Sequence, residues 1–272
     1  MLLYTQREFK NDVLPSRNQG LSGRATYDYD QRYLFEFNFG YNGTERLGKG
    51  DRFEFFPAVS LGWLVSNEKF FEPLSDVVSS LKLRGSYGLV GSDETGPSNA
   101  PHFLYIDQVQ VTGNGRPGFT TGENLNVSYY GPVVQQWAVQ NGGWERVKKL
   151  DVGFDMELFR ELSITFDFFY DKRYNILLHR EAWPQSLGFH EAKPWSNKGK
   201  VDNWGYEVST NWRKQFTKDL TVDFRGTFTY TQNKYRDVDE PIYPYVWQTA
   251  TGKPLNRRNG YIAEGLFQSR KK

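Results

Sequence analysis

The sequence predicts an all-β protein, with an antiparallel up-and-down sheet that forms a segment of a transmembrane β-barrel. Three observations predict it. Apolar and polar residues alternate with period two in eight segments, short and long connections alternate between those segments, and aromatic residues gather at both ends of the apolar faces. Aromatic residues make up 17% of the 272 residues. No apolar run approaches the ~18 residues that a membrane helix needs.

The alternation is clearest between residues 150 and 158. Leu150, Val152 and Phe154 lie on one face of this segment, and Asp151 and Asp155 lie on the other. Such a pattern is typical of a strand with one face in an apolar medium and the other in a polar one. Strands are expected near 21–30, 32–41, 52–65, 80–90, 144–159, 162–172, 201–214 and 220–232. A helical period appears only at 67–79, which predicts one or two turns.

The connections between the expected strands differ in an ordered way. Short ones follow the first, third, fifth and seventh strands, at Asp30-Gln31, 66–79, Arg160-Glu161 and 215–219. Longer ones follow the second, fourth and sixth strands, at 42–51, 91–143 and 173–200, and residues 233–272 follow the eighth. Alternate connections lie at the same end of an up-and-down sheet. The order therefore predicts short periplasmic turns and long extracellular loops.

Aromatic residues on the apolar faces are expected to form two belts at the membrane interfaces, where an amphipathic ring is most stable. At the short-turn ends the residues are Tyr33, Trp63 and Trp212. At the long-loop ends they are Phe39, Tyr41, Phe53, Trp144, Tyr170, Trp204 and Tyr230. The alternative is a soluble β-sandwich, a carbohydrate-binding module whose alternating face is its core. Periodicity alone does not separate the two, whereas the belts and the unequal loops favour the barrel.

Composition and motifs argue against most other functions. A net charge of +2 argues against a nucleic-acid binder, and the absence of cysteine excludes a disulfide framework and a thiolate zinc site. The three histidines lack metal-ligand spacing, so no metal and no cofactor are expected. The G-x-G-x-x-G match at 113–118 lies in a polar loop with no helix after it.

Carboxylates on the polar faces could in principle pair as the acid and base of a glycosidase, which needs two carboxyl groups at a defined spacing. These residues are Asp151, Asp155, Glu157, Asp167, Glu207 and Asp223. Cations on the same faces are Lys82, Arg84, Arg213 and Arg225. The favoured interpretation is a hydrated lumen wall with balanced charges. No catalytic residue is therefore assigned, and the protein is not expected to be an enzyme.

Several motifs occur in series along the chain. They are Gly23–Leu34 (GRATYDYDQRYL), Phe56–Trp63 (FPAVSLGW), Glu68–Phe71 (EKFF), Leu81–Gly88 (LKLRGSYG), Asn197–Gly199 with Asn203–Glu207 (NKG and NWGYE), and Gly260-Tyr261 with Gly265–Ser269 (GLFQS). In residues, order and spacing, over about residues 17–269, the chain resembles the C-terminal half of SusC/RagA-type TonB-dependent transporters of Bacteroidetes outer membranes.

The resemblance implies a large plugged barrel of the 22-stranded type in the cell outer membrane, in contact with its lipids. Residues 1–272 would be a partial barrel domain, without the plug domain, the TonB box and a signal peptide, and hence a fragment. It also implies active import of oligosaccharides or peptides, a SusD-like surface lipoprotein over the loop end, and energy from the TonB-ExbB-ExbD complex through the plug. No nucleic acid is expected as a partner.

Aromatic residues outside the strands are the candidate ligand-binding residues, because exposed rings can stack on a glycan or a peptide. They are Tyr129, Tyr130, Trp137, Trp183, Trp195 and Trp247, with Tyr243 and Tyr245 nearby. The alternative is that these rings pack the long loops against each other or against a lid protein.

Overall fold

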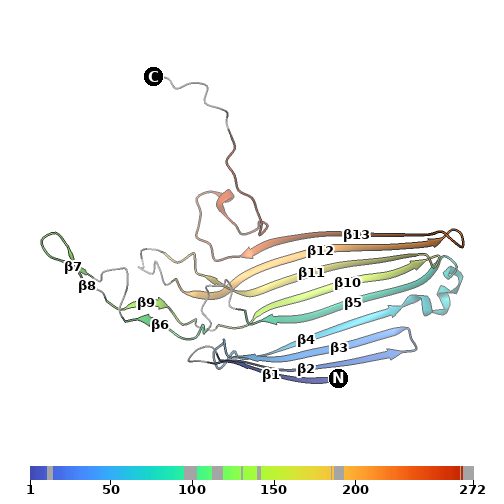
Figure 1. The fold of residues 1–272 in the computed structure, drawn as a ribbon, viewed down its shortest axis with the longest axis horizontal. Helices are drawn as coiled ribbons and strands as arrows, with labels where there is room; N and C mark the ends of the chain where they lie inside the picture. The colour runs from blue at the N-terminus through green and yellow to red at the C-terminus, as the bar shows by residue number, and fades with distance from the viewer. Residues whose placement is uncertain are drawn as a thin grey trace.

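A computed structural model describes residues 1–10, 15–94, 103–111, 119–129, 131–139, 142–184, 186, 193–263 and 265. Nine strands form one antiparallel sheet with β1 and β13 at its edges, and neighbours in the sheet follow one another along the chain (Figure 1). The strands are β1 (Leu2–Phe9), β2 (Ser16–Tyr29), β3 (Tyr33–Thr44), β4 (Phe53–Leu64), β5 (Val78–Ser92), β10 (Glu145–Leu158), β11 (Leu162–His179), β12 (Trp195–Gln215) and β13 (Thr221–Asp237). The predicted fold class is confirmed.

Shorter elements occupy the connections. The segment between β5 and β10 contains β6 (Gln108–Gln110) paired with β9 (Val133–Gln136), and β7 (Phe119–Thr121) paired with β8 (Val127–Tyr129). The connections also contain the 3-10 helices η1 (Val65–Asn67), η2 (Lys69–Leu74) and η4 (Val246–Gln248). No helix in the described part of the chain has the length and apolar character to cross a membrane.

Each of the eight expected strand ranges overlaps one strand of the sheet, but several strands continue further toward the long loops. β11 runs to His179 rather than to 172, β12 begins at Trp195 rather than at 201, and β13 runs to Asp237 rather than to 232. The β1 strand was not predicted. All eight of its residues are exposed, and β2 is its only partner among the described strands, so its sequence carries no alternation that marks a buried face.

The tight turns at the short-connection end have left-handed backbone at two successive residues. Asp30 and Gln31 have φ of 54° and 50°, as the predicted connection requires. The next tight turn has φ of 54° at Phe159 and 56° at Arg160. Its central residues are therefore Phe159-Arg160, and the predicted Arg160-Glu161 is wrong by one residue.

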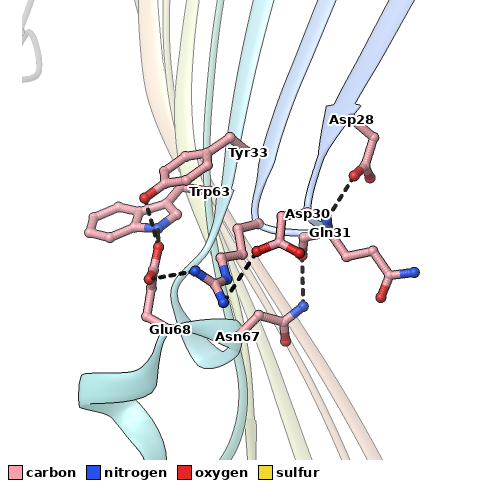
Figure 2. A network of polar contacts seen from close by, with 8 residues as sticks. Asp28, Asp30, Gln31, Tyr33, Trp63, Asn67 and Glu68 are labelled. Carbon is pink, nitrogen blue, oxygen red and sulfur yellow. Dashed lines mark hydrogen bonds and ion pairs between the residues drawn. The ribbon is translucent and has the colours of Figure 1, made fainter.

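A polar network joins the β2–β3 turn to the β4–β5 connection (Figure 2). The Glu68 carboxylate accepts hydrogen bonds from the Tyr33 hydroxyl at 2.7 Å and from the Trp63 indole at 3.1 Å. It also lies 3.6 Å from the guanidinium of Arg32. Asn67 donates to the Gln31 carbonyl at 2.7 Å. These contacts hold two turns together that are far apart in the sequence.

The sheet is a single layer, and its apolar face is open. Val152, Phe168 and Phe228 on this face are 48%, 37% and 55% exposed. In a β-sandwich a second sheet would cover such residues, and none of the other described sheets is larger than two strands. The soluble-sandwich alternative is therefore wrong.

Candidate functional site

The register of the sheet lines up outward-facing apolar residues in rows across the strands. One row contains Phe37, Val59, Tyr87, Leu150, Tyr170 and Trp204, each opposite the next. At the turn end, the apolar face of β4 stops at Trp63 and that of β12 stops at Trp212. Counted along the register, Trp212 lies two rows further than Trp63.

The apolar band therefore crosses the sheet obliquely. Two rows are four residues, or about 13 Å at ~3.3 Å per residue, and the four strand spacings from β4 to β12 are about 19 Å. These lengths give an angle of about 35°, within the ~35–45° strand tilt of membrane barrels. The slope of the band follows from the pairing alone and supports a membrane orientation for the sheet.

Most belt residues lie at the ends of the sheet where the sequence analysis predicts them. Tyr33 and Trp63 are opposite each other at the turn end and stack with ring centroids 6.4 Å apart. Trp204 and Tyr230 contact each other toward the loop end, with centroids 5.9 Å apart. Trp144 is the exception, because it is only 6% exposed and packs edge-on against Phe56. Its assignment to the belt is wrong.

The opposite face of the sheet carries paired charges, as expected for a hydrated lumen wall. Arg84 on β5 lies 3.2 Å from Asp155, 2.7 Å from Asp167 and 3.5 Å from Asp151. Arg213 lies 3.8 Å from Asp223. One guanidinium thus lies among three carboxylates from two neighbouring strands, and it offsets part of their negative charge rather than leaving an isolated acid pair.

Two small hydrophobic cores form at the loop end, where the strands rise past the apolar band. Leu104, Val139, Leu177 and Trp195 make up one core. Leu47, Phe56 and Trp144 make up the other, with Leu89 packed against it. The Trp144 indole donates to the Arg52 carbonyl at 3.2 Å. These cores attach the β3–β4 and β5–β10 loops to the ends of the strands.

The loops after β11 and β13 are joined by ion pairs. Arg180 donates to Asp239 at 2.6 Å, and Lys198 lies 3.3 Å from the same carboxylate, which is 8% exposed. Arg180 also lies 5.4 Å from the centre of the Trp183 ring. One buried carboxylate therefore links the loop after β11, strand β12 and the segment that follows β13.

The segment after β13 folds back on the end of that strand. Glu240 accepts hydrogen bonds from the backbone N–H of Ala250 at 2.7 Å and of Thr251 at 2.9 Å. Partial burial opposes ionisation of Glu240, but the two N–H donors outweigh it and lower the pKa of this carboxyl. The fold-back presents Tyr245 and Trp247 as a stacked pair, with ring centroids 4.4 Å apart and planes 11° apart.

The candidate ligand-binding aromatics do not form one site. Trp247 is 66% exposed, Tyr129 is 50% exposed and stacks on Phe119 at 4.7 Å, and Trp137 is 40% exposed. Trp183 is half-buried beside Arg180, and Trp195 is 8% exposed against His179. Tyr130 lies outside the described residues. Exposed, parallel rings are therefore found at Tyr245–Trp247 and Phe119–Tyr129, while Trp195 belongs to a core.

No group of three or more potential metal ligands occurs among the residues that the structure describes. His179 lies against the Trp195 ring, with its Nδ1 3.3 Å from the Lys193 carbonyl oxygen. His102, His190 and the glycine-rich segment 113–118 lie outside the described residues.

Comparison with known proteins gives concordant matches. Residues 4–265 match the family model described as TonB dependent receptor-like, beta-barrel. TonB-dependent receptor P3 of Formosa agariphila is 29% identical over 248 residues, which cover 89% of this chain and 23% of that protein. TonB-dependent receptor SusC of Bacteroides thetaiotaomicron is 29% identical over 213 residues, which cover 78% of this chain and 20% of that protein.

A solved structure of the RagAB peptide importer in the "closed-closed" state has the same fold. It aligns with a TM-score of 0.68 and 20% identity over 88% of this chain and 25% of the solved chain. The matched region of this chain thus covers only 20% to 25% of the length of each of these proteins.

Proposed function

Because the chain belongs to the TonB-dependent receptor-like β-barrel family, we propose that it forms part of the wall and the outer loops of an active nutrient importer. Proteins of this family lie in the outer membrane, so the apolar face of the sheet contacts lipid and the charged face lines the lumen. The family is one of receptors and transporters rather than of enzymes. The observation that carries the proposal is the oblique apolar band on one face of a single-layered meander whose other face is charged.

The proposal also includes the parts of the importer that lie outside residues 1–272. Residues 1–272 would be a section of a larger barrel, with a plug domain and TonB box elsewhere in the same protein. The TonB-ExbB-ExbD complex would act on that plug. A SusD-like lipoprotein would cover the loop end, where the stacked Tyr245–Trp247 pair is exposed. The similarity to the RagAB peptide importer supports a peptide as the imported molecule, and the resemblance to SusC-type transporters supports an oligosaccharide.

Among the predicted aromatics, Trp247 has the best geometry for contacting the imported molecule. It is the most exposed of the six in the described part of the chain, and Tyr245 holds its ring parallel. Arg257 donates to the Trp247 carbonyl at 2.9 Å and fixes the backbone beneath the ring. Tyr129, Tyr130, Trp137 and Trp183 remain further candidates in the same proposal. Trp195 is proposed instead to stabilise the loop base.

The test uses the full-length protein in its outer membrane and compares Trp247→Ala with Trp195→Ala. Binding of oligosaccharide and peptide libraries is measured by calorimetry, and uptake is measured in cells with and without TonB. Loss of one stacking ring weakens affinity by about 2- to 10-fold. We expect this loss in Trp247→Ala without loss of thermal stability. Unchanged affinity in that variant would exclude the ring as a ligand contact, and uptake that persists without TonB would exclude the importer.

A further inference from the structure

A row of basic side chains crosses the lipid-facing side of the sheet directly above the apolar band. Lys148, Lys172, Asp202 and Lys234 lie opposite one another on β10, β11, β12 and β13. Lys148, Lys172 and Asp202 stand two residues beyond the outward band residues of their strands, and Lys234 stands four residues beyond Tyr230 on β13. An even number of residues keeps a side chain on the same face of a strand, so all four face outward. We call Lys148, Lys172 and Lys234, together with Arg236, the basic ridge.

The carboxylate that lies in this row, that of Asp202, already has two partners at its Oδ2 atom. Asp202 is 5% exposed, accepts a hydrogen bond from the Tyr170 hydroxyl at 3.0 Å and lies 2.5 Å from Arg236. The neighbouring carboxylates face the other side of the sheet and have other partners. Asp171 lies 3.8 Å from Lys149, and Asp237 lies 3.6 Å from Lys200. The ridge therefore keeps an excess of positive charge that the described part of the chain does not neutralise.

The positions of Lys148 and Lys172 are unfavourable without an anion. The two are directly opposite each other, and side chains in that position have Cβ atoms about 4.5–5.5 Å apart, where like charges destabilise a sheet. Both residues are exposed, and no carboxylate of a described residue lies within ion-pair distance of either. Lys148 extends over the Tyr174 ring at 5.7 Å, so its stem is held on the outer surface.

The position of the basic ridge relative to the apolar band indicates which anion would meet it. Leu150, Tyr170 and Trp204 form the edge row of the apolar band on these strands, and the ridge begins one row above it, about 7 Å along the strands. Lysine ammonium groups at that distance reach the head-group layer of the outer leaflet. That leaflet contains phosphorylated glycolipid, and lysine and arginine bind phosphate through charge-assisted hydrogen bonds.

We propose that the basic ridge binds the phosphate groups of outer-leaflet glycolipid and fixes this part of the barrel wall at a defined height in the membrane. The proposal rests on the outer-membrane location of the family and is independent of the imported substrate. A phosphate between Lys148 and Lys172 would turn a repulsive pair into a bridged one. Arg236 would contribute guanidinium N–H groups that Asp202 does not use.

The test is carried out on the full-length protein with the triple variant Lys148→Gln, Lys172→Gln and Lys234→Gln. Its matched control carries Lys49→Gln, Lys69→Gln and Lys218→Gln, which remove the same charge from exposed loop and turn positions. Both proteins are reconstituted with phosphatidylcholine vesicles that contain either phosphorylated lipid A or its dephosphorylated form. Bound lipid A is measured by native mass spectrometry.

Each lysine near an anionic surface contributes about fivefold in binding, so the triple variant should bind phosphorylated lipid A on the order of 100-fold more weakly. The control should bind like the wild type, and dephosphorylated lipid A should not distinguish the three proteins. If the triple variant fails to assemble, Lys172→Gln alone is measured, with Lys172→Arg expected to retain binding. Equal binding by variant and wild type overturns the proposal. The proposal is also overturned if the triple variant still binds lipid A but no longer co-purifies with a lipoprotein that the wild type binds.

Discussion

Phe166 offers the sharpest test of which face of the sheet meets lipid. It is the third of five outward residues on β11, between Tyr170 and Leu162, and therefore lies at the centre of the apolar band. Its ring stacks on Phe154 with centroids 5.5 Å apart and on Tyr206 with centroids 6.5 Å apart. Replacing it with lysine places a charge near the bilayer midplane and removes both ring contacts.

The magnitude follows from these two losses. A lysine near the midplane of a membrane barrel costs about 2–4 kcal/mol. Each aromatic pair contributes about 0.5–1.5 kcal/mol beyond its buried area. Phe166→Lys should therefore lower the free energy of unfolding by about 3–7 kcal/mol. Phe166→Leu keeps an apolar residue and should lose only the ring contacts, or about 1–3 kcal/mol.

The assay is equilibrium urea unfolding of the full-length barrel folded into lipid vesicles. The control is Ser163→Lys, three residues away on the same strand but on the charged face, directly opposite Glu157. We expect that variant to differ from wild type by less than about 1 kcal/mol, because an exposed ion pair contributes ~0.2–1 kcal/mol. If Ser163→Lys is as destabilising as Phe166→Lys, the assignment of the two faces is wrong.

Three further predictions concern the turn end, the sheet interior and the loop base. Hydrogen bonds from Tyr33 and Trp63, aided by Arg32, lower the pKa of Glu68. Its contribution to stability should therefore be complete at neutral pH and decline as the pH falls below the ordinary glutamate value of 4.5 toward the lower folded value. In urea titrations at several pH values, Glu68→Gln should remove this decline and Glu72→Gln should preserve it. A Cβ on Gly153 would overlap the Phe166 carbonyl oxygen, whereas one on Gly85 would be 3.8 Å from its nearest neighbour. Unfolding measurements should show a loss of about 1–3 kcal/mol for Gly153→Ala and almost none for Gly85→Ala. Trp195→Ala should lower the free energy of unfolding by about 3–5 kcal/mol, and a smaller loss than in Trp247→Ala would contradict the packing described above.

The part of each strand that crosses the lipid could be predicted from the sequence, because there one face meets lipid and the other meets water. Residues 150–158 show this alternation without interruption. Beyond the band the alternation ends, since both faces meet polar groups or loops. The pairing of Lys172 with Asp202 therefore could not be predicted, and with it the basic ridge was missed.

The candidate site was harder to predict because burial at the loop end depends on distant residues. Trp144 carries the same local pattern as a belt residue, yet Phe56 from another strand covers it. Trp195 follows a polar loop, and its partners Leu104 and Val139 come from a different connection. Trp247 remains exposed for a local reason, the fold-back held by Glu240. Composition identifies loop aromatics as a class but does not separate rings that support the loops from rings that meet a ligand.

The length of the strands connects the lipid-facing band with the proposed loop site. On β12 the outward face from Trp204 to Trp212 spans nine residues and is aromatic or aliphatic except at Thr210. This length matches the ~9–11 residues with which a strand crosses a bilayer. Trp195 to Asn203 continue the same paired strand above the lipid, and β11 and β13 continue beside it. With the strands tilted by the angle derived from the apolar band, this extension raises the wall about 20 Å above the lipid. The loops are thus attached to a hydrogen-bonded wall rather than to the membrane surface. We therefore expect the basic ridge to set the height of that wall, and the Asp239 ion pairs to hold the Tyr245–Trp247 loop against it.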